Sequence, residues 1–485
     1  MLQTLKTLSK HSLIYGLGGG LNKLLAFLLL PIFTRYLTPA DYGLFSLLLV
    51  TGGVAGIITQ LGLGSALFRE VIYFDTDERT ATSTALYFLI GESLLIFGGL
   101  ALFAGPLSQL IFGSTLQTET LRLVFYTGIL RVAEIVFMAR LRIKERAALY
   151  SAVSVARFLV GAGLSILYIV VLKQGVSGLI IAGLIQAGIF AGVYLVILLP
   201  GLRPVVSGPV LRSMLLFGAP MVPAGLADLI MISSDRYFLQ QYASTAEVGL
   251  YSLGYTIGMV MNLAVWSVQL AWPALMFSIA KQETAPQQFA RILTYYVLVL
   301  GFLGLGLSLL ARELLVIMTT PEFHGAAAVV PLVAVSYIFY GVRYMTNTAL
   351  PTRDKMKYVP LIIILAALVN LGLNLLLIPP YGMLGAAWAT LISYFLLTVV
   401  STAVNQHFWS MPYEYVRLLK VTVAWVAIYG LGLAVPAANP WVGGGIKLLL
   451  LVLGFPVILW VLRFFDRQEL ATVRTLLGGS LGRKV

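Results

Sequence analysis

Long, nearly unbroken runs of apolar residues, separated by short polar segments, dominate this chain of 485 residues. A helix crosses the hydrocarbon core of a bilayer with about 20 mostly apolar residues, because each residue rises about 1.5 Å. The runs have this length, and they do not alternate between apolar and polar positions as the strands of a membrane β-barrel do. The pattern therefore predicts an all-α polytopic membrane protein.

The apolar runs fall into two sets of six, followed by a final pair. With a window of about 19 residues we place the first six spans near 13–37, 42–64, 81–103, 120–140, 147–172 and 178–200. The second six lie near 214–237, 248–274, 292–311, 326–347, 359–378 and 383–405, and the pair near 418–437 and 446–463. This arrangement predicts about 14 transmembrane helices in an N-terminal lobe (1–200), a C-terminal lobe (201–405) and an additional helix pair with a cytoplasmic tail (406–485).

Two sequence echoes indicate that the lobes are duplicated copies of one unit. Tyr36–Leu47 matches Tyr242–Leu253 at an offset of 206, and Gly175–Gly178 matches Gly382–Gly385 at an offset of 207. The identities in the first match include Gly43/Gly249 and Ser46/Ser252. Because six spans are an even number, both copies insert in the same direction. Their pseudo-two-fold axis is therefore predicted to run along the membrane normal, with a central cleft between the lobes.

The positive charges of the short loops predict the orientation of the chain. Most loop Lys and Arg residues gather on one predicted side, which is also the side of both termini; Arg140, Arg142, Lys144, Arg146, Arg353, Lys355 and Lys357 are among them. Cytoplasmic loops are enriched in these residues, so both termini are predicted to be cytoplasmic. The net charge of +13 follows largely from this bias. No basic surface with interleaved aromatic residues points to nucleic acid.

The composition leaves little for catalysis. The chain has no cysteine and three histidines, which argues against disulfides and against a metal site. The predicted loops are about 20 residues long at most, and they carry no paired carboxylates at a spacing that would suit an enzyme. A membrane glycosyltransferase or polymerase is therefore disfavoured.

Two segments carry a resemblance to a known family. They are Leu37–Gly43, after the first span, and Ser234–Leu239, which leads into Val248–Tyr255. With these segments, the chain resembles the polysaccharide transporter (Wzx-like) flippases of the multidrug/oligosaccharidyl-lipid/polysaccharide (MOP) exporter superfamily. The resemblance implies movement of an undecaprenyl-diphosphate-linked oligosaccharide to the outer leaflet of a bacterial inner membrane, for O-antigen, capsule or exopolysaccharide assembly. Its implied partners are this glycolipid, membrane lipids and other polysaccharide assembly proteins.

Cations near the centres of the predicted spans are the candidate substrate-binding residues. Lys23, Arg131 and Arg157 lie near mid-membrane, and Arg343 lies nearer the cytoplasmic end of its span. Charge at such depth is costly, so each residue needs a partner, water or a function. Fixed cations in a wet cleft would suit a diphosphate or an acidic sugar. The alternatives are neutralisation within the lobe, for example of Arg131 by Glu134, and snorkelling of Arg343. Three other arginines are expected to be interfacial anchors near the outer face: Arg35, Arg122 and Arg236.

Four carboxylates are candidates for coupling or gating. Glu92 and Asp228 lie deep in their spans and would suit a coupling ion, Na⁺ or H⁺, although a structural hydrogen bond is the alternative for each. Asp41 and Glu247 occupy equivalent positions in the repeated loop. They are candidates for gating the outer face, while the turn around Thr38 also predicts helix capping. No cofactor is expected.

Two other transport functions stay open from the sequence alone. A cation-coupled drug exporter of the same superfamily would place carboxylates and aromatic residues in its cavity. In this chain most ionisable residues near the centres of the predicted spans are cations. A peptidoglycan-precursor flippase is the other alternative, because such proteins also have two helices after the duplicated lobes.

Overall fold

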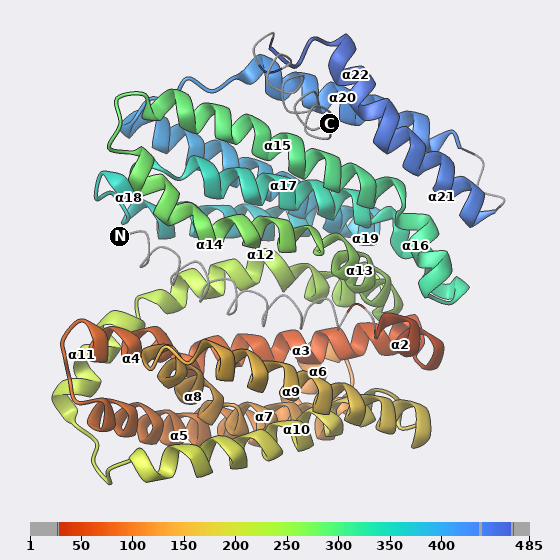
Figure 1. Ribbon diagram of the computed structural model, residues 1–485. Coiled ribbons are helices and arrows are strands. Elements are labelled where there is room, and N and C mark those ends of the chain that lie inside the picture. Colours follow the sequence, from red (N-terminus) through yellow and green to blue (C-terminus); the bar gives the residue numbers. More distant parts are fainter. Residues whose placement is uncertain (1–26, 28, 436–438, 467–468, 470–485) are drawn as a thin grey trace, which may run out of the picture.

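The computed structural model describes residues 27, 29–435, 439–466 and 469, and every regular element in this part of the chain is a helix (Figure 1). The N-terminal body contains α2 (Leu30–Tyr36), α3 (Pro39–Gln60), α4 (Leu63–Ile72), α5 (Glu78–Leu102), α6 (Ala104–Phe112), α7 (Thr118–Leu130), α8 (Val132–Ile143), α9 (Ala147–Ile166) and α10 (Gly175–Leu198). The connecting helix α11 (Gly208–Gly218) packs against α4 and α5 of this body.

The C-terminal body follows directly and lies beside the first (Figure 1). It contains α12 (Met221–Tyr242), α13 (Thr245–Gly258), α14 (Met261–Ile279), α15 (Ala285–Leu309), α16 (Ala311–Met318), α17 (Val330–Thr346), α18 (Ala349–Thr352) and α19 (Tyr358–Phe408). The first member of the final pair is α20 (Tyr415–Leu433). The second is the span Pro440–Val461, which contains α21 (Pro440–Leu449) and α22 (Phe455–Val461). The pair packs on α15 and α16, away from the N-terminal body. The predicted all-helical, two-lobed fold is confirmed.

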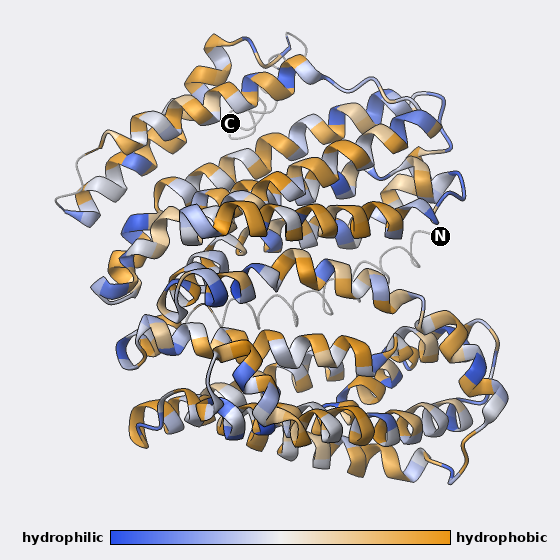
Figure 2. Ribbon diagram, turned by 180° about the vertical axis from the view of Figure 1, so that it is seen from behind, coloured by the Kyte–Doolittle hydropathy of each residue, from blue (hydrophilic) through white to orange (hydrophobic). Residues whose placement is uncertain are grey.

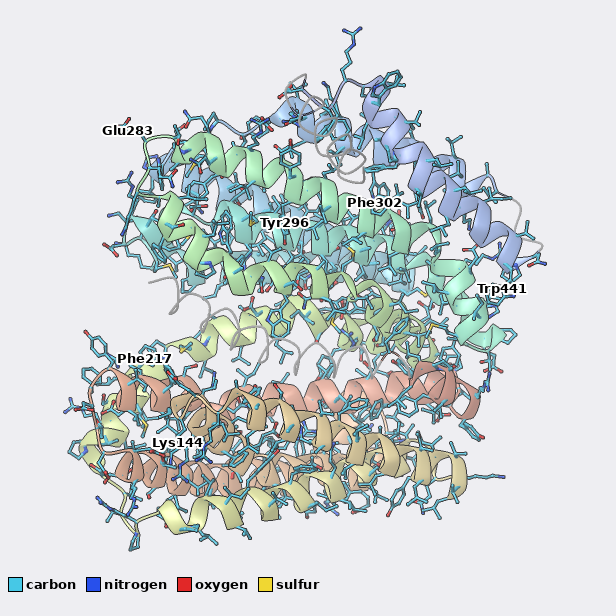
Figure 3. The ribbon with its side chains drawn as sticks, in the orientation of Figure 1. Lys144, Phe217, Glu283, Tyr296, Phe302 and Trp441 are labelled. Atoms are coloured by element: carbon cyan, nitrogen blue, oxygen red, sulfur yellow. The ribbon has the colours of Figure 1, made fainter. Side chains whose placement is uncertain are left out.

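The helices have the length and composition of membrane spans. Among the described residues, nine helices are long and apolar enough to cross a bilayer, or eleven if each of two bent pairs forms one span. Figure 2 shows hydrophobic residues along the helices and many hydrophilic ones at their ends. Figure 3 places Lys144 and Glu283 toward one end of the helices and Trp441 at the other. The predicted first span falls mostly outside the described residues, so the total of 14 helices stays a prediction.

The second sequence echo marks the same turn in both lobes. Gly175, at the start of α10, has φ +56°, and Gly382, where two predicted spans meet inside α19, has φ +51° and ψ −132°. Only glycine adopts a positive φ without steric cost, so the echo preserves a required backbone conformation. The turn at Gly382 is also packed: a Cβ there would lie 2.3 Å from a carboxylate oxygen of Glu247.

The first sequence echo forms the contact between the lobes. Helices α3 and α13 cross so closely that a Cβ on Gly43 would lie 2.0 Å from the Thr245 carbonyl oxygen. A Cβ on Gly249 would lie 1.8 Å from the Pro39 carbonyl oxygen, which is the equivalent contact with the copies exchanged. Ser252 Oγ donates to Ser46 Oγ at 2.9 Å, and these two residues are also equivalent. The pseudo-two-fold axis therefore passes through the α3–α13 crossing.

Ion pairs fix the final helix pair to the C-terminal lobe. Lys447 of α21 binds Glu313 of α16 at 2.6 Å, and both side chains are about nine-tenths buried. At the other end, Glu469 accepts hydrogen bonds from Tyr295 and Arg291 of α15 and lies 3.0 Å from Arg417 of α20. Burial alone would raise the pKa of Glu469, but these contacts lower it to about 2. The pair thus extends the C-terminal lobe.

The turn between the two halves of α19 provides a stability test. We expect Gly382→Ala to destabilise the protein by about 1–3 kcal/mol, because alanine at a positive φ is strained and its methyl group meets Glu247. Gly372→Ala in the same helix is the control, since a Cβ there has no neighbour within 4 Å. The thermal unfolding midpoint in detergent measures both, and equal midpoints for the two variants would contradict the interpretation.

Candidate functional site

Arg131 occupies a break in the fourth predicted span. Helix α7 ends at Leu130 and α8 begins at Val132, so the fourth predicted span is divided at this residue. The backbone N–H of Arg131 still donates to the Thr127 carbonyl, and the Glu134 N–H donates to the Arg131 carbonyl three residues back. The Arg131 side chain at this break is exposed.

Arg131 lines a cavity of about 580 Å³ inside the N-terminal lobe. Helices α3, α5, α7, α8, α9 and α10 form its walls, and the segment around α2 completes them. Six glycines keep the space open: Gly52, Gly53, Gly56, Gly128, Gly161 and Gly183. A cavity of this size falls in the range of about 300–1,000 Å³ that small-molecule sites have.

Arg157 and Glu134 form an ion pair beside this cavity, between α9 and α8. Pairing of Glu134 with Arg131 was one alternative from the sequence, but the structure pairs Glu134 with Arg157 of α9 instead. The Gln186 amide, on the cavity wall, donates to the Arg157 carbonyl oxygen at 2.6 Å.

Arg131 itself is left as an uncompensated cation. No hydrogen bond or ion pair joins its guanidinium to another described residue. The segments that the structure does not describe contain no aspartate or glutamate side chain. Its charge and that of Arg157 act on one another. The described part of the cavity therefore presents one net positive charge in a low-dielectric interior, where an anion would be attracted strongly.

Arg343 does not join this cavity. Arg343 lies in the C-terminal lobe on α17, with its guanidinium over the Tyr340 ring at 5.7 Å and its Nε buried without a partner among the described residues. Asp228 of α12 is near enough for its charge to interact with that of Arg343, although the two side chains form no ion pair. Lys23 falls outside the described residues.

The deep carboxylates lie in different lobes. Glu92 is on α5 of the N-terminal lobe, and its buried Oε2 has no hydrogen-bond partner within the described part of the chain. It is not among the residues that line the cavity. Asp228 is exposed on α12 of the C-terminal lobe. The structure therefore does not assemble the two candidate coupling residues into one site.

The two candidate gating carboxylates both hold local structure. Asp41 completes a capping box at the start of α3, where it accepts from the Thr38 N–H at 3.0 Å and from the Thr38 hydroxyl at 2.8 Å. Glu247, at the equivalent place on α13, accepts instead from the Met383 N–H at 2.9 Å. In the C-terminal lobe, Glu247 thus connects the two repeated segments.

Arg236 is a contact residue that sequence reasoning assigned wrongly. It was expected at the outer interface, but it is buried and pairs with the adjacent Asp235 at 3.1 Å. Its Nε also donates to Ser46 Oγ of the other lobe at 3.0 Å, and its guanidinium lies 5.0 Å from the Tyr255 ring centre. The adjacent opposite charges in Asp235-Arg236 were the available signal for a buried pair.

A second hydrogen bond joins the lobes next to Arg236. Tyr237 of α12 and Thr51 of α3 have their hydroxyl oxygens 2.9 Å apart. Together with the contacts of Ser46, this forms a seam of hydroxyl groups along the α3–α13 crossing. The seam holds the lobes together through hydrogen bonds to hydroxyl groups, each with a net value of only about 0.5–3 kcal/mol.

Comparison with known proteins identifies the fold. The lipid II flippase MurJ in an inward closed conformation matches with a TM-score of 0.69 at 13% identity, covering 93% of this chain and 97% of that one. A MATE structure in complex with MaL6 matches with a TM-score of 0.58 at 16% identity, covering 86% and 97%. An outward-facing multidrug resistance MATE family transporter of the MOP superfamily gives 0.58 at 15% identity, covering 86% and 96%.

The family comparison reaches a more specific result. No curated protein matches the chain. A family model described as "Polysaccharide biosynthesis protein" matches residues 32–328, which is more than half of the chain and spans both lobes. This match confirms the resemblance seen in the sequence. The chain belongs to the polysaccharide biosynthesis protein family, and it has the multi-pass helical fold of MOP superfamily transporters rather than that of an enzyme.

Proposed function

We propose that this protein is a flippase that moves a polyprenyl-diphosphate-linked oligosaccharide across a bacterial inner membrane, for assembly of O-antigen, capsule or exopolysaccharide. The family supports a role in polysaccharide synthesis, and the fold supports transport. The observation that carries the proposal is the uncompensated Arg131 guanidinium on a cavity inside the N-terminal lobe. A drug exporter of cations would not place a free positive charge there.

The physical role of Arg131 is to lower the barrier for an anion. A diphosphate that leaves the aqueous phase loses its hydration, and the cost of this is large in a medium of low dielectric constant. A guanidinium with no partner among the described residues offers both charge and a planar set of donors that matches phosphate oxygens. Arg157, which Glu134 neutralises, would support the site rather than supply its charge.

Alternating access follows from the contact between the lobes. For substrate to reach the outer leaflet, the lobes must separate on the side of the α3–α13 crossing. In the proposed orientation the basic loops and both termini are cytoplasmic, so this crossing is the outer gate. Close packing of the two helices and hydrogen bonds to hydroxyl groups hold it closed, and a coupling ion would contribute to its opening.

A coupling ion, Na⁺ or H⁺, is part of the proposal. Asp228 is the candidate carboxylate in the C-terminal lobe, because it is exposed and its charge already interacts with that of Arg343. Glu92 is the candidate in the N-terminal lobe, since its buried oxygen has no partner among the described residues. Other polysaccharide assembly proteins would supply the substrate and receive it.

A flipping assay with purified protein in liposomes tests the assignment of Arg131. We expect Arg131→Gln to reduce flipping of a lipid-linked oligosaccharide at least about tenfold, and its thermal stability to stay at the wild-type level because no pair is broken. Arg122→Gln is the matched control: it removes an arginine of the same region that pairs with Glu119 at 2.5 Å.

The same assay separates the competing functions. Full flipping activity of Arg131→Gln would contradict the assignment of Arg131 to the substrate-binding site. Wild-type protein that flipped a peptidoglycan precursor and ignored the oligosaccharide-linked lipid would replace the proposed substrate. Transport of cationic dyes alone would assign the chain to drug export.

A further inference from the structure

The cavity in the N-terminal lobe is long and changes character along its length. Phe45 and Gln60 of α3 both line it, and 15 residues of helix between them correspond to about 22 Å. Near Phe45 the walls also include Leu29 and Phe33, which are apolar. At the other end, Leu61, next to Gln60, packs in one hydrophobic cluster with Val132, next to Arg131, and both Arg131 and Gln186 line the cavity. One end of the cavity therefore suits a charged group, and the other suits hydrocarbon.

Two hydroxyl groups of the lining, those of Thr59 and Thr127, have no proton left to donate to a ligand and can only accept. The Thr59 hydroxyl donates to the Ala55 carbonyl at 2.7 Å, and the Thr127 hydroxyl donates to the Leu123 carbonyl at 2.8 Å. With these hydroxyl groups occupied by their own helices, the middle of the cavity consists largely of glycine backbone and apolar side chains. Ser165 also lines the cavity, but a sugar here would meet few hydrogen-bond donors, and a buried polar group without a partner costs about 1–3 kcal/mol in protein interiors.

We propose that this cavity binds the lipid end of the substrate, with a phosphate group at Arg131 and the first isoprenoid units along the apolar remainder. The glycan then lies outside the cavity. The inference rests on the proposed function, and it deepens it by assigning one part of the substrate to one lobe. An amphiphile with an anionic head and a hydrocarbon chain matches both ends of the cavity, whereas a free sugar phosphate matches only one.

Glycines on α10 provide a way to fill the cavity without disturbing the fold. A Cβ on Gly183, which lines the cavity, has no neighbour within 4 Å. Gly192 of the same helix also has open space at its Cβ, but it does not line the cavity and is exposed on the lobe surface. Leucine at either position adds the same side chain to the same helix. Only leucine at 183 takes up the space that a prenyl chain would occupy.

The test measures binding of farnesyl diphosphate, a short prenyl diphosphate without sugar, to the full-length protein in nanodiscs. We expect wild-type protein to bind the probe and Gly183→Leu to bind it about tenfold more weakly, equivalent to about 1.4 kcal/mol. Gly192→Leu should bind like wild type. Arg131→Gln should lose binding, and Arg131→Lys should retain part of it because the charge remains. A lipid-free, phosphate-free oligosaccharide should not compete.

The outcomes distinguish this inference from the proposed function. Equal affinities of Gly183→Leu and Gly192→Leu, both folded by thermal unfolding, would overturn the inference, as would displacement of the probe by the lipid-free oligosaccharide. Gly53→Leu, which fills the cavity from α3, is a second variant if Gly183→Leu does not fold. If wild-type protein flips the lipid-linked oligosaccharide but does not bind the probe, this inference is contradicted and the proposed function is not. Wild-type protein that flips no such lipid would remove the proposed function.

Discussion

The cost of holding charge inside a low-dielectric lobe is the constraint on which this structure depends. At three buried or half-buried places an opposite charge offsets that cost: Arg157 pairs with Glu134, Arg236 with Asp235, and Lys447 with Glu313. Such pairs are not strong sources of stability, but breaking one is costly because the remaining charge has no partner. Glu92 and Arg343 each have a buried polar atom without a partner among the described residues, and Arg131 departs from this rule on the wall of a cavity. A charge that the fold leaves uncompensated marks a place where a ligand can supply the compensation.

The duplication explains why the molecule has two similar lobes. The differences between the lobes indicate that each has its own role. The α3–α13 crossing is nearly symmetric, since equivalent glycines and equivalent serines touch there. Around this axis the lobes differ. The N-terminal lobe holds the cavity with Arg131, while the C-terminal lobe holds a buried Asp235-Arg236 pair that also reaches Ser46 across the seam. One lobe is thus suited to the ligand and the other to fixing the gate.

Much of the fold could be predicted from the sequence because it depends on local composition. The apolar runs predicted the helices, and the repeated glycines at 43, 175, 249 and 382 predicted the duplication because each is required by a close contact or a positive φ. Less of the candidate site could be predicted from the sequence. Arg131 and Arg157 were identified by their depth, but their partners depend on tertiary contacts: Glu134 reaches Arg157 across 23 residues and two helices. The break at Arg131 carries no proline or glycine, so no local signal predicted it.

The central claim is that the lobes separate at the α3–α13 crossing during transport. The chain has no cysteine, so a pair introduced at the two equivalent serines, Ser46→Cys with Ser252→Cys, would be the only thiols, on side chains now 2.9 Å apart. The most direct measurement is flipping of lipid-linked oligosaccharide by this double variant before oxidation, after oxidation and after reduction, with each single variant as control. The account predicts that the disulfide abolishes flipping and that reduction restores it. Undiminished flipping by fully cross-linked protein would contradict it.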